Sequence, residues 1–74
     1  MDGSQIKFAN LDDFMRETHA ELKIGLCKLY FDDGEWVVVK AKSVDSKYIV
    51  QDRFLDAVPS ALESALRFFY TLAA

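Results

Sequence analysis

The stretch from Lys23 to Lys42, KIGLCKLYFDDGEWVVVKAK, decides the fold. It contains two segments in which apolar and polar residues alternate, separated by Asp32-Asp33-Gly34. An Asp-Gly pair between two such segments is a strong local signal for a β-hairpin. The stretch therefore predicts two antiparallel strands joined by a tight turn.

Two loop lengths are compatible with this turn. A two-residue loop, Asp33-Gly34, pairs Leu29 with Val38 and mixes lysine with apolar residues on both faces of the hairpin. A three-residue loop with a left-handed Gly34 pairs Leu29 with Val37 instead. We prefer the three-residue loop because it produces one wholly apolar face, which a one-residue slip would destroy. That face comprises Gly25, Cys27, Leu29, Val37, Val39 and Ala41.

The opposite face of the hairpin carries lysines beside two aromatic rings, and we predict that it binds a partner. Tyr30 lies opposite Trp36 in this register, and both residue types are enriched at interfaces. Lys42 and Lys47 face each other across the next turn, a repulsion that an anionic partner would relieve. The alternative is a solvated face whose lysines oppose edge-to-edge aggregation. The predicted partner-binding residues here are Lys28, Tyr30, Trp36, Lys40, Lys42 and Lys47.

A helix is predicted before the hairpin. Gln5 to Ala9 alternates and is compatible with a short strand in front of it. Asn10 is the expected N-cap of a helix that runs to about residue 23 and is stopped by Gly25. Its apolar stripe consists of Leu11, Phe14, Met15, Thr18 and Leu22.

A third strand is predicted over residues 47–52, after the turn that follows the hairpin. Its alternation places Tyr48 and Val50 on the apolar face. Phe54 and Leu55 follow in a connection that we expect to tuck under the core.

A second helix is predicted at the end of the chain. Pro59 suits a first helical turn, and Ser60 followed by Glu63 has the spacing of a capping box. Phe68 and Tyr70 flank the apolar stripe, so we predict that they add a dimer seam to the partner-binding surface. The stripe itself consists of Leu62, Ala65, Leu66, Phe69, Leu72 and Ala73.

The expected architecture is a single α+β domain over residues 1–74. A three-stranded antiparallel meander is flanked by two helices on one face, in the order α-β-β-β-α. Double-stranded-RNA-binding domains share this element order, and they contact phosphates with lysines at the start of their last helix. Here Pro59 to Glu63 reads PSALE, without lysine. The shared order therefore favours the fold and argues against that function.

Composition narrows the function further. With 74 residues the core is small, and a chain of this size is often supplemented by a disulfide, a metal or a second subunit. Cys27 is the single cysteine, which leaves a partner subunit as the expected supplement.

The net charge of −3 argues mildly against general nucleic-acid binding. The first ten residues lack a secretory pattern and no apolar run is long enough to span a bilayer, so we expect a cytoplasmic protein.

Candidate catalytic groups are few. His19 is the single histidine, and Cys27 is predicted in the core, which disfavours a Cys–His pair. Asp32, Asp33 and Glu35 crowd the hairpin turn, but a calcium loop needs six or more oxygen ligands from a longer segment. We therefore predict that the chain is not an enzyme and holds neither a cofactor nor a metal.

These observations predict a small non-enzymatic interaction or regulatory module. We expect it to form a homodimer and to bind a protein partner through the lysine and aromatic face, the last helix, or both. The alternative is nucleic-acid binding by the same face, which steep weakening with salt would reveal.

Overall fold

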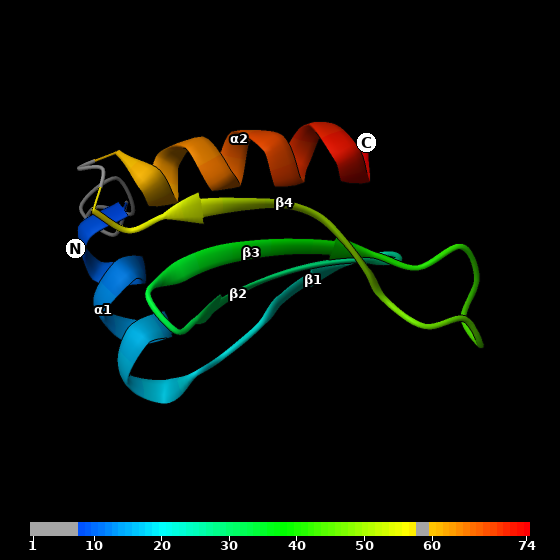
Figure 1. Cartoon of the computed structure of the whole chain (residues 1–74), viewed down its shortest axis with the longest axis horizontal. Coiled ribbons are helices and arrows are strands. Elements are labelled where there is room, and N and C mark those ends of the chain that lie inside the picture. Colours follow the sequence, from blue (N-terminus) through cyan, green and yellow to red (C-terminus); the bar gives the residue numbers. More distant parts are fainter. Residues whose placement is uncertain (1–7, 58–59) are drawn as a thin grey trace, which may run out of the picture.

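The computed structural model describes residues 8–57 and 60–74, in which a long helix runs along one face of an antiparallel sheet (Figure 1). Two helices and four strands occur within those residues, which confirms the α+β class and corrects the predicted strand count. The strands form a meander in the order β1-β2-β3-β4. The elements are α1 (Phe8–Thr18), β1 (Leu22–Ile24), β2 (Cys27–Asp32), β3 (Glu35–Lys40), β4 (Ile49–Leu55) and α2 (Ala61–Ala73).

The additional strand, β1, occupies residues that were predicted as the end of the first helix. His19 ends α1 with a φ of 56°, and its backbone N–H donates to the carbonyl of Met15 at 3.0 Å. This left-handed residue caps a helix that ends at Thr18, five residues before the predicted end at about residue 23. Gly25, at a φ of 58°, instead forms the turn between β1 and β2. The prediction failed because Leu22 fits the helical stripe and the strand alternation equally well.

The predicted start of the first helix is also wrong. Asn10 lies inside α1 and therefore does not cap it. Of the predicted strand Gln5–Ala9, residues 5–7 lie outside the described part of the chain, while Phe8 and Ala9 are helical.

The β2–β3 hairpin has the two-residue loop, so the preferred register is wrong by one residue. Asp32 pairs with Glu35 and Leu29 pairs with Val38. The loop residues Asp33 and Gly34 have φ values of 48° and 78°. Positive φ at both positions is the signature of the turn whose twist matches that of the flanking strands. The preference of the two-residue loop for this turn therefore outweighs the uniform apolar face that the three-residue loop would produce.

The last strand begins and ends later than predicted. β4 covers Ile49–Leu55 rather than residues 47–52, so Phe54 and Leu55 belong to the strand and not to a connection. Its register against β3 shifts between Val38 and Val39, where Gln51 is the extra residue. Such a bulge bends an edge strand.

The core lies between α2 and one face of the sheet. α2 contacts β2, β3 and β4, while α1 packs at the end of the sheet beside the β2–β3 turn (Figure 1). Trp36 is completely buried in this core, with its ring centroid 4.8 Å from that of Phe31. The predicted helical stripe is confirmed, because the buried residues of α2 are Ala61, Leu62, Ala65, Leu66 and Phe69.

The capping box predicted for α2 does not form. The side chain of Ser60 makes no hydrogen bond to the helix, although its backbone carbonyl accepts from Ser64 at 2.9 Å. Glu63 instead pairs with Arg67, 2.7 Å away on the next turn.

Candidate protein-binding surface

The face of the sheet that points away from α2 is the candidate surface, and we call it the outer sheet face. Its members follow from strand pairing and from the alternation of side chains along each strand. No helix within residues 8–57 and 60–74 packs on it, since both helices contribute to the core on the other side. The outer sheet face comprises Lys23, Lys28, Tyr30, Asp32, Glu35, Val37, Val39, Val50, Arg53 and Leu55.

The centre of the outer sheet face is apolar. Val37 and Val39 are only 1% and 4% exposed, although no helix covers them. Their cross-strand neighbours Tyr30, Lys28 and Arg53 shield them, which long side chains do by laying their stems over apolar surface. A solvated sheet face normally alternates to polar residues at such positions. The run of three valines in β3 is therefore buried on both faces of the sheet.

Exposed apolar side chains extend this centre toward the β4 edge. Val50 is 41% exposed and Leu55 is 61% exposed on the outer sheet face. Tyr48, just before β4, is 38% exposed, and its ring centroid lies 4.3 Å from the Nζ of Lys28. Arg53 lies between Val50 and Leu55 on the same face of β4, so the exposed apolar side chains are separated by a cation.

Two cations of the outer sheet face already have anionic neighbours. The Nζ of Lys28 lies 3.2 Å from Glu21, and Nη1 of Arg53 lies 3.0 Å from Glu35. Lys23 is exposed and is the direct cross-strand neighbour of Lys28. Like charges placed in this way repel each other.

The structure divides the predicted partner-binding residues among three places. Lys28 and Tyr30 lie on the outer sheet face, and Lys42 and Lys47 are exposed in the loop between β3 and β4. The placement of Trp36 and Lys40 is wrong, because the corrected register turns both toward the core side. Their role as binding residues was inferred from that placement.

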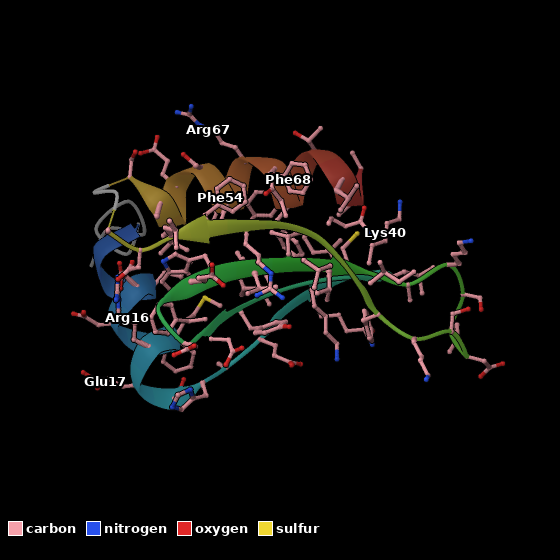
Figure 2. All side chains as sticks on the ribbon, in the orientation of Figure 1. Arg16, Glu17, Lys40, Phe54, Arg67 and Phe68 are labelled. Atoms are coloured by element: carbon pink, nitrogen blue, oxygen red, sulfur yellow. The ribbon has the colours of Figure 1, made fainter. Side chains whose placement is uncertain are left out.

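Lys40 is half-buried at the edge of the core. Figure 2 shows it near the C-terminal end of α2, where the helix dipole favours a cation. A lysine in such a position can lay its aliphatic stem over apolar surface and keep its ammonium group in solvent. This position explains how a lysine is accommodated on the core side of β3.

The last helix contributes less exposed aromatic surface than predicted. Phe68 is half-buried against Phe54 of β4, with ring centroids 6.0 Å apart (Figure 2). Tyr70 is 55% exposed and its ring packs 5.5 Å from that of Phe69. Phe54 also lines an open hollow of about 290 Å³, together with Arg53, Leu55, Ala61 and Ser64.

A polar cluster centred on Arg16 was not predicted from the sequence. Arg16 on α1 forms ion pairs with Asp12, one turn earlier, and with Asp56, which follows β4 (Figure 2). Its guanidinium carbon lies 4.9 Å from the ring centroid of Phe31. Asp56 also accepts a hydrogen bond from the indole N–H of Trp36 at 3.0 Å. Only the four-residue spacing of Asp12 and Arg16 was visible in the sequence.

The electrostatics of this cluster indicate a structural role. The hydrogen bonds from Arg16 lower the pKa of Asp56, against the opposing effect of burial, and the Trp36 hydrogen bond lowers it further. An ionised carboxylate with this many donors is stabilised in place and is a poor proton acceptor. The cluster therefore joins α1 to the sheet.

Among the described residues, no group of three or more His, Cys, Asp or Glu side chains is arranged to hold a metal ion. No described helix is both long enough and apolar enough to cross a membrane. Cys27 is buried in the core, at 2% exposure.

Comparisons with protein-family models, with curated proteins and with solved structures give no match to this chain. The outer sheet face is therefore the main basis for a functional proposal.

Proposed function

We propose that this chain is a non-enzymatic interaction module that binds a protein partner through the outer sheet face. The observation that supports this proposal is the apolar centre of a sheet face that no described helix covers. Val37 and Val39 form its middle, and Val50 and Leu55 remain exposed beside them. Burying exposed apolar area is the main source of free energy in protein association.

The arrangement of aromatic and charged groups is in keeping with a protein partner. Tyr30 is half-buried beside the central valines, and tyrosine is enriched among residues that dominate binding energy. Lys28 and Arg53, which lie directly beside the central valines, are paired with Glu21 and Glu35. An apolar centre with a polar rim is the usual anatomy of such interfaces.

Nucleic-acid binding is less well supported by this geometry. Trp36, which was predicted to lie on the face offered for nucleic-acid binding, is fully buried on the other side of the sheet. Two of the cations on the outer sheet face, Lys28 and Arg53, are paired with carboxylates. Phosphate binding relies on clustered positive charge that is free to displace counterions.

A pair of matched variants tests the proposal. Val50→Glu places a charge on the outer sheet face, whereas Tyr70→Glu places the same charge on the exposed side of α2. Both side chains are already more than a third exposed, so we expect both variants to fold, which circular dichroism would check. Interfaces exclude uncompensated charge from their centre, so only Val50→Glu should weaken binding.

The measurement is quantitative cross-linking in native lysate, combined with hydrogen exchange of the purified assembly. We expect wild type and Tyr70→Glu to form the same assembly, with added protection of amides in β2 and β3. We expect Val50→Glu to lose it. An assembly that persists in Val50→Glu and is lost in Tyr70→Glu would contradict the proposal.

A further inference from the structure

The outer sheet face has charges of opposite sign at its two ends. Asp32, Asp33 and Glu35 lie at the β2–β3 turn. Lys23, Lys42 and Lys47 lie at the opposite end, around the β1–β2 turn and the loop after β3. The strands run the length of the sheet between these ends, as Figure 1 shows. Asp45 lies in the same loop as Lys42 and Lys47, so this end keeps a net positive charge. The face is therefore acidic at one end and basic at the other, and between them the paired cations Lys28 and Arg53 lie beside the central valines.

Most of these terminal charges lack a counter-ion. Among the described residues, no ion pair involves Lys23, Lys42 or Lys47 at the basic end, or Asp32 or Asp33 at the acidic end. Asp32 also faces Glu35 directly across the hairpin, and Lys23 faces Lys28. Both like-charge pairs destabilise the isolated sheet, and an oppositely charged partner surface would relieve both.

From this pattern we propose that the occupant of the outer sheet face is a second copy of this chain, a proposal that rests on the proposed protein-binding function. The two outer sheet faces stack with their strands antiparallel, related by a two-fold axis that is perpendicular to the strands. This axis places the acidic end of each copy over the basic end of the other. A two-fold axis along the strands would instead bring like charges together, and like-charge contacts across an interface are costly.

The apolar centre then lies on the symmetry axis. Val50 and Tyr30 of one copy, together with the stems of Lys28 and Arg53 that cover Val37 and Val39, face the same residues of the other copy, at the spacing of about 10 Å that separates stacked sheets. A four-stranded sheet with six-residue strands measures about 19 by 20 Å. This area is smaller than the roughly 800 Å² that each partner buries in an interface of standard size. We therefore expect a dimer that dissociates on dilution into the micromolar range.

Charge-swap variants test the proposed orientation. The acid-end variant combines Asp32→Lys with Asp33→Asn, because asparagine tolerates the positive φ at position 33. The base-end variant combines Lys23→Glu with Lys42→Glu, both at exposed positions. Asp32→Lys and Lys23→Glu each replace a like-charge cross-strand pair with an opposite-charge pair, so both variants should fold.

Sedimentation equilibrium of the full chain over a dilution series measures the result. Wild type is expected to dimerise, and each variant alone is expected to dimerise at least tenfold more weakly. An equimolar mixture of the two variants is expected to restore a one-to-one dimer, because complementary charges then meet at both ends. Salt should weaken the wild-type dimer by screening the terminal charges.

Three outcomes would overturn the second-copy proposal. One is a wild-type monomer at every concentration, and another is a mixture that stays monomeric while both variants remain folded. The third is wild-type chain that binds a duplex oligonucleotide as a monomer, with steep salt dependence. The proposed protein-binding function is tested separately. If the wild-type chain stays monomeric but binds a different protein, and Val50→Glu no longer binds that protein, protein binding is retained and self-association is excluded.

Discussion

At the residue scale, Asp56 connects three segments that are distant in sequence. It pairs with Arg16 on α1, accepts the indole N–H of Trp36, and its backbone N–H donates to the carbonyl of Gly34 at 3.0 Å. A carboxylate in this position holds the helix, the hairpin turn and the end of β4 together. Its contribution to stability should therefore depend on its charge.

Asp56→Asn is expected to lower the free energy of unfolding at pH 7 by about 1 kcal/mol, a modest value because solvent partly screens the pair. The pKa of Asp56 is lower in the folded chain than the ordinary value of about 3.9. The unfolded chain therefore binds the proton first as the pH falls. The difference between wild type and Asp56→Asn should be full above about pH 5 and disappear below the folded pKa.

Urea unfolding from pH 3 to pH 7 would measure this dependence. Asp13→Asn is the matched control. Asp13 is exposed on α1, the helix that carries Arg16, and makes none of the contacts of the Arg16 cluster. A constant difference between Asp56→Asn and wild type across this range would show that the charge of Asp56 is not what stabilises the fold.

Trp36 gives a second prediction at this scale. Because its side chain is completely buried, Trp36→Ala should cost about 3–5 kcal/mol, a large part of the stability of so small a domain. Trp36→Phe should cost less, since the ring contact with Phe31 is retained and only the indole hydrogen bond to Asp56 is lost. Thermal unfolding followed by circular dichroism would measure both. A folded and fully stable Trp36→Ala would contradict the buried position.

At the element scale, the β2–β3 turn determines which residues face the core. Gly34→Ala places a side chain at a φ of 78°, with no neighbouring atom within 4 Å of the added carbon. The cost is therefore conformational, and we expect the free energy of unfolding to fall by about 1–2 kcal/mol. Asp33→Asn serves as the control because asparagine tolerates its φ of 48°. Equal stability of Gly34→Ala and Asp33→Asn in urea would exclude this turn type.

The N-terminal end of α2 yields a contrasting prediction. A serine that caps a helix normally contributes about 1 kcal/mol through its hydroxyl group. Since the Ser60 side chain makes no such bond, Ser60→Ala should change the free energy of unfolding by less than about 0.5 kcal/mol. A loss near 1 kcal/mol in urea unfolding would show that the capping box predicted from the sequence forms in solution.

Some features of these elements could be predicted from the sequence and others could not. The stripe of α2 was predictable because Leu62, Leu66 and Phe69 repeat at helical spacing over about two turns. The hairpin itself was predictable, but its register was not, because Val37, Val38 and Val39 fit either face. The Arg16 cluster was out of reach of sequence reasoning, since Arg16 and Asp56 are 40 positions apart. Long-range pairing of this kind depends on the fold being known.

At the scale of the whole molecule, a chain of 74 residues has little apolar area with which to stabilise its fold. A core on one side of a small sheet provides a narrow margin. If the outer sheet faces stack as proposed, the exposed side chains of Val50 and Leu55 are removed from water, whereas Val37 and Val39 are already buried in the single chain. Folding and association are then linked, because only the folded chain forms the dimer.

This linkage predicts that the unfolding temperature of wild type rises with protein concentration. Between about 5 and 500 μM chain, a hundredfold range, mass action contributes up to about 2.7 kcal/mol of additional stability. The acid-end variant should show little such rise at the same concentrations, because its former acidic end no longer attracts the basic end of the other copy. Differential scanning calorimetry would measure both curves at low salt. The same rise in wild type and variant would mean that any self-association uses a surface other than the outer sheet face.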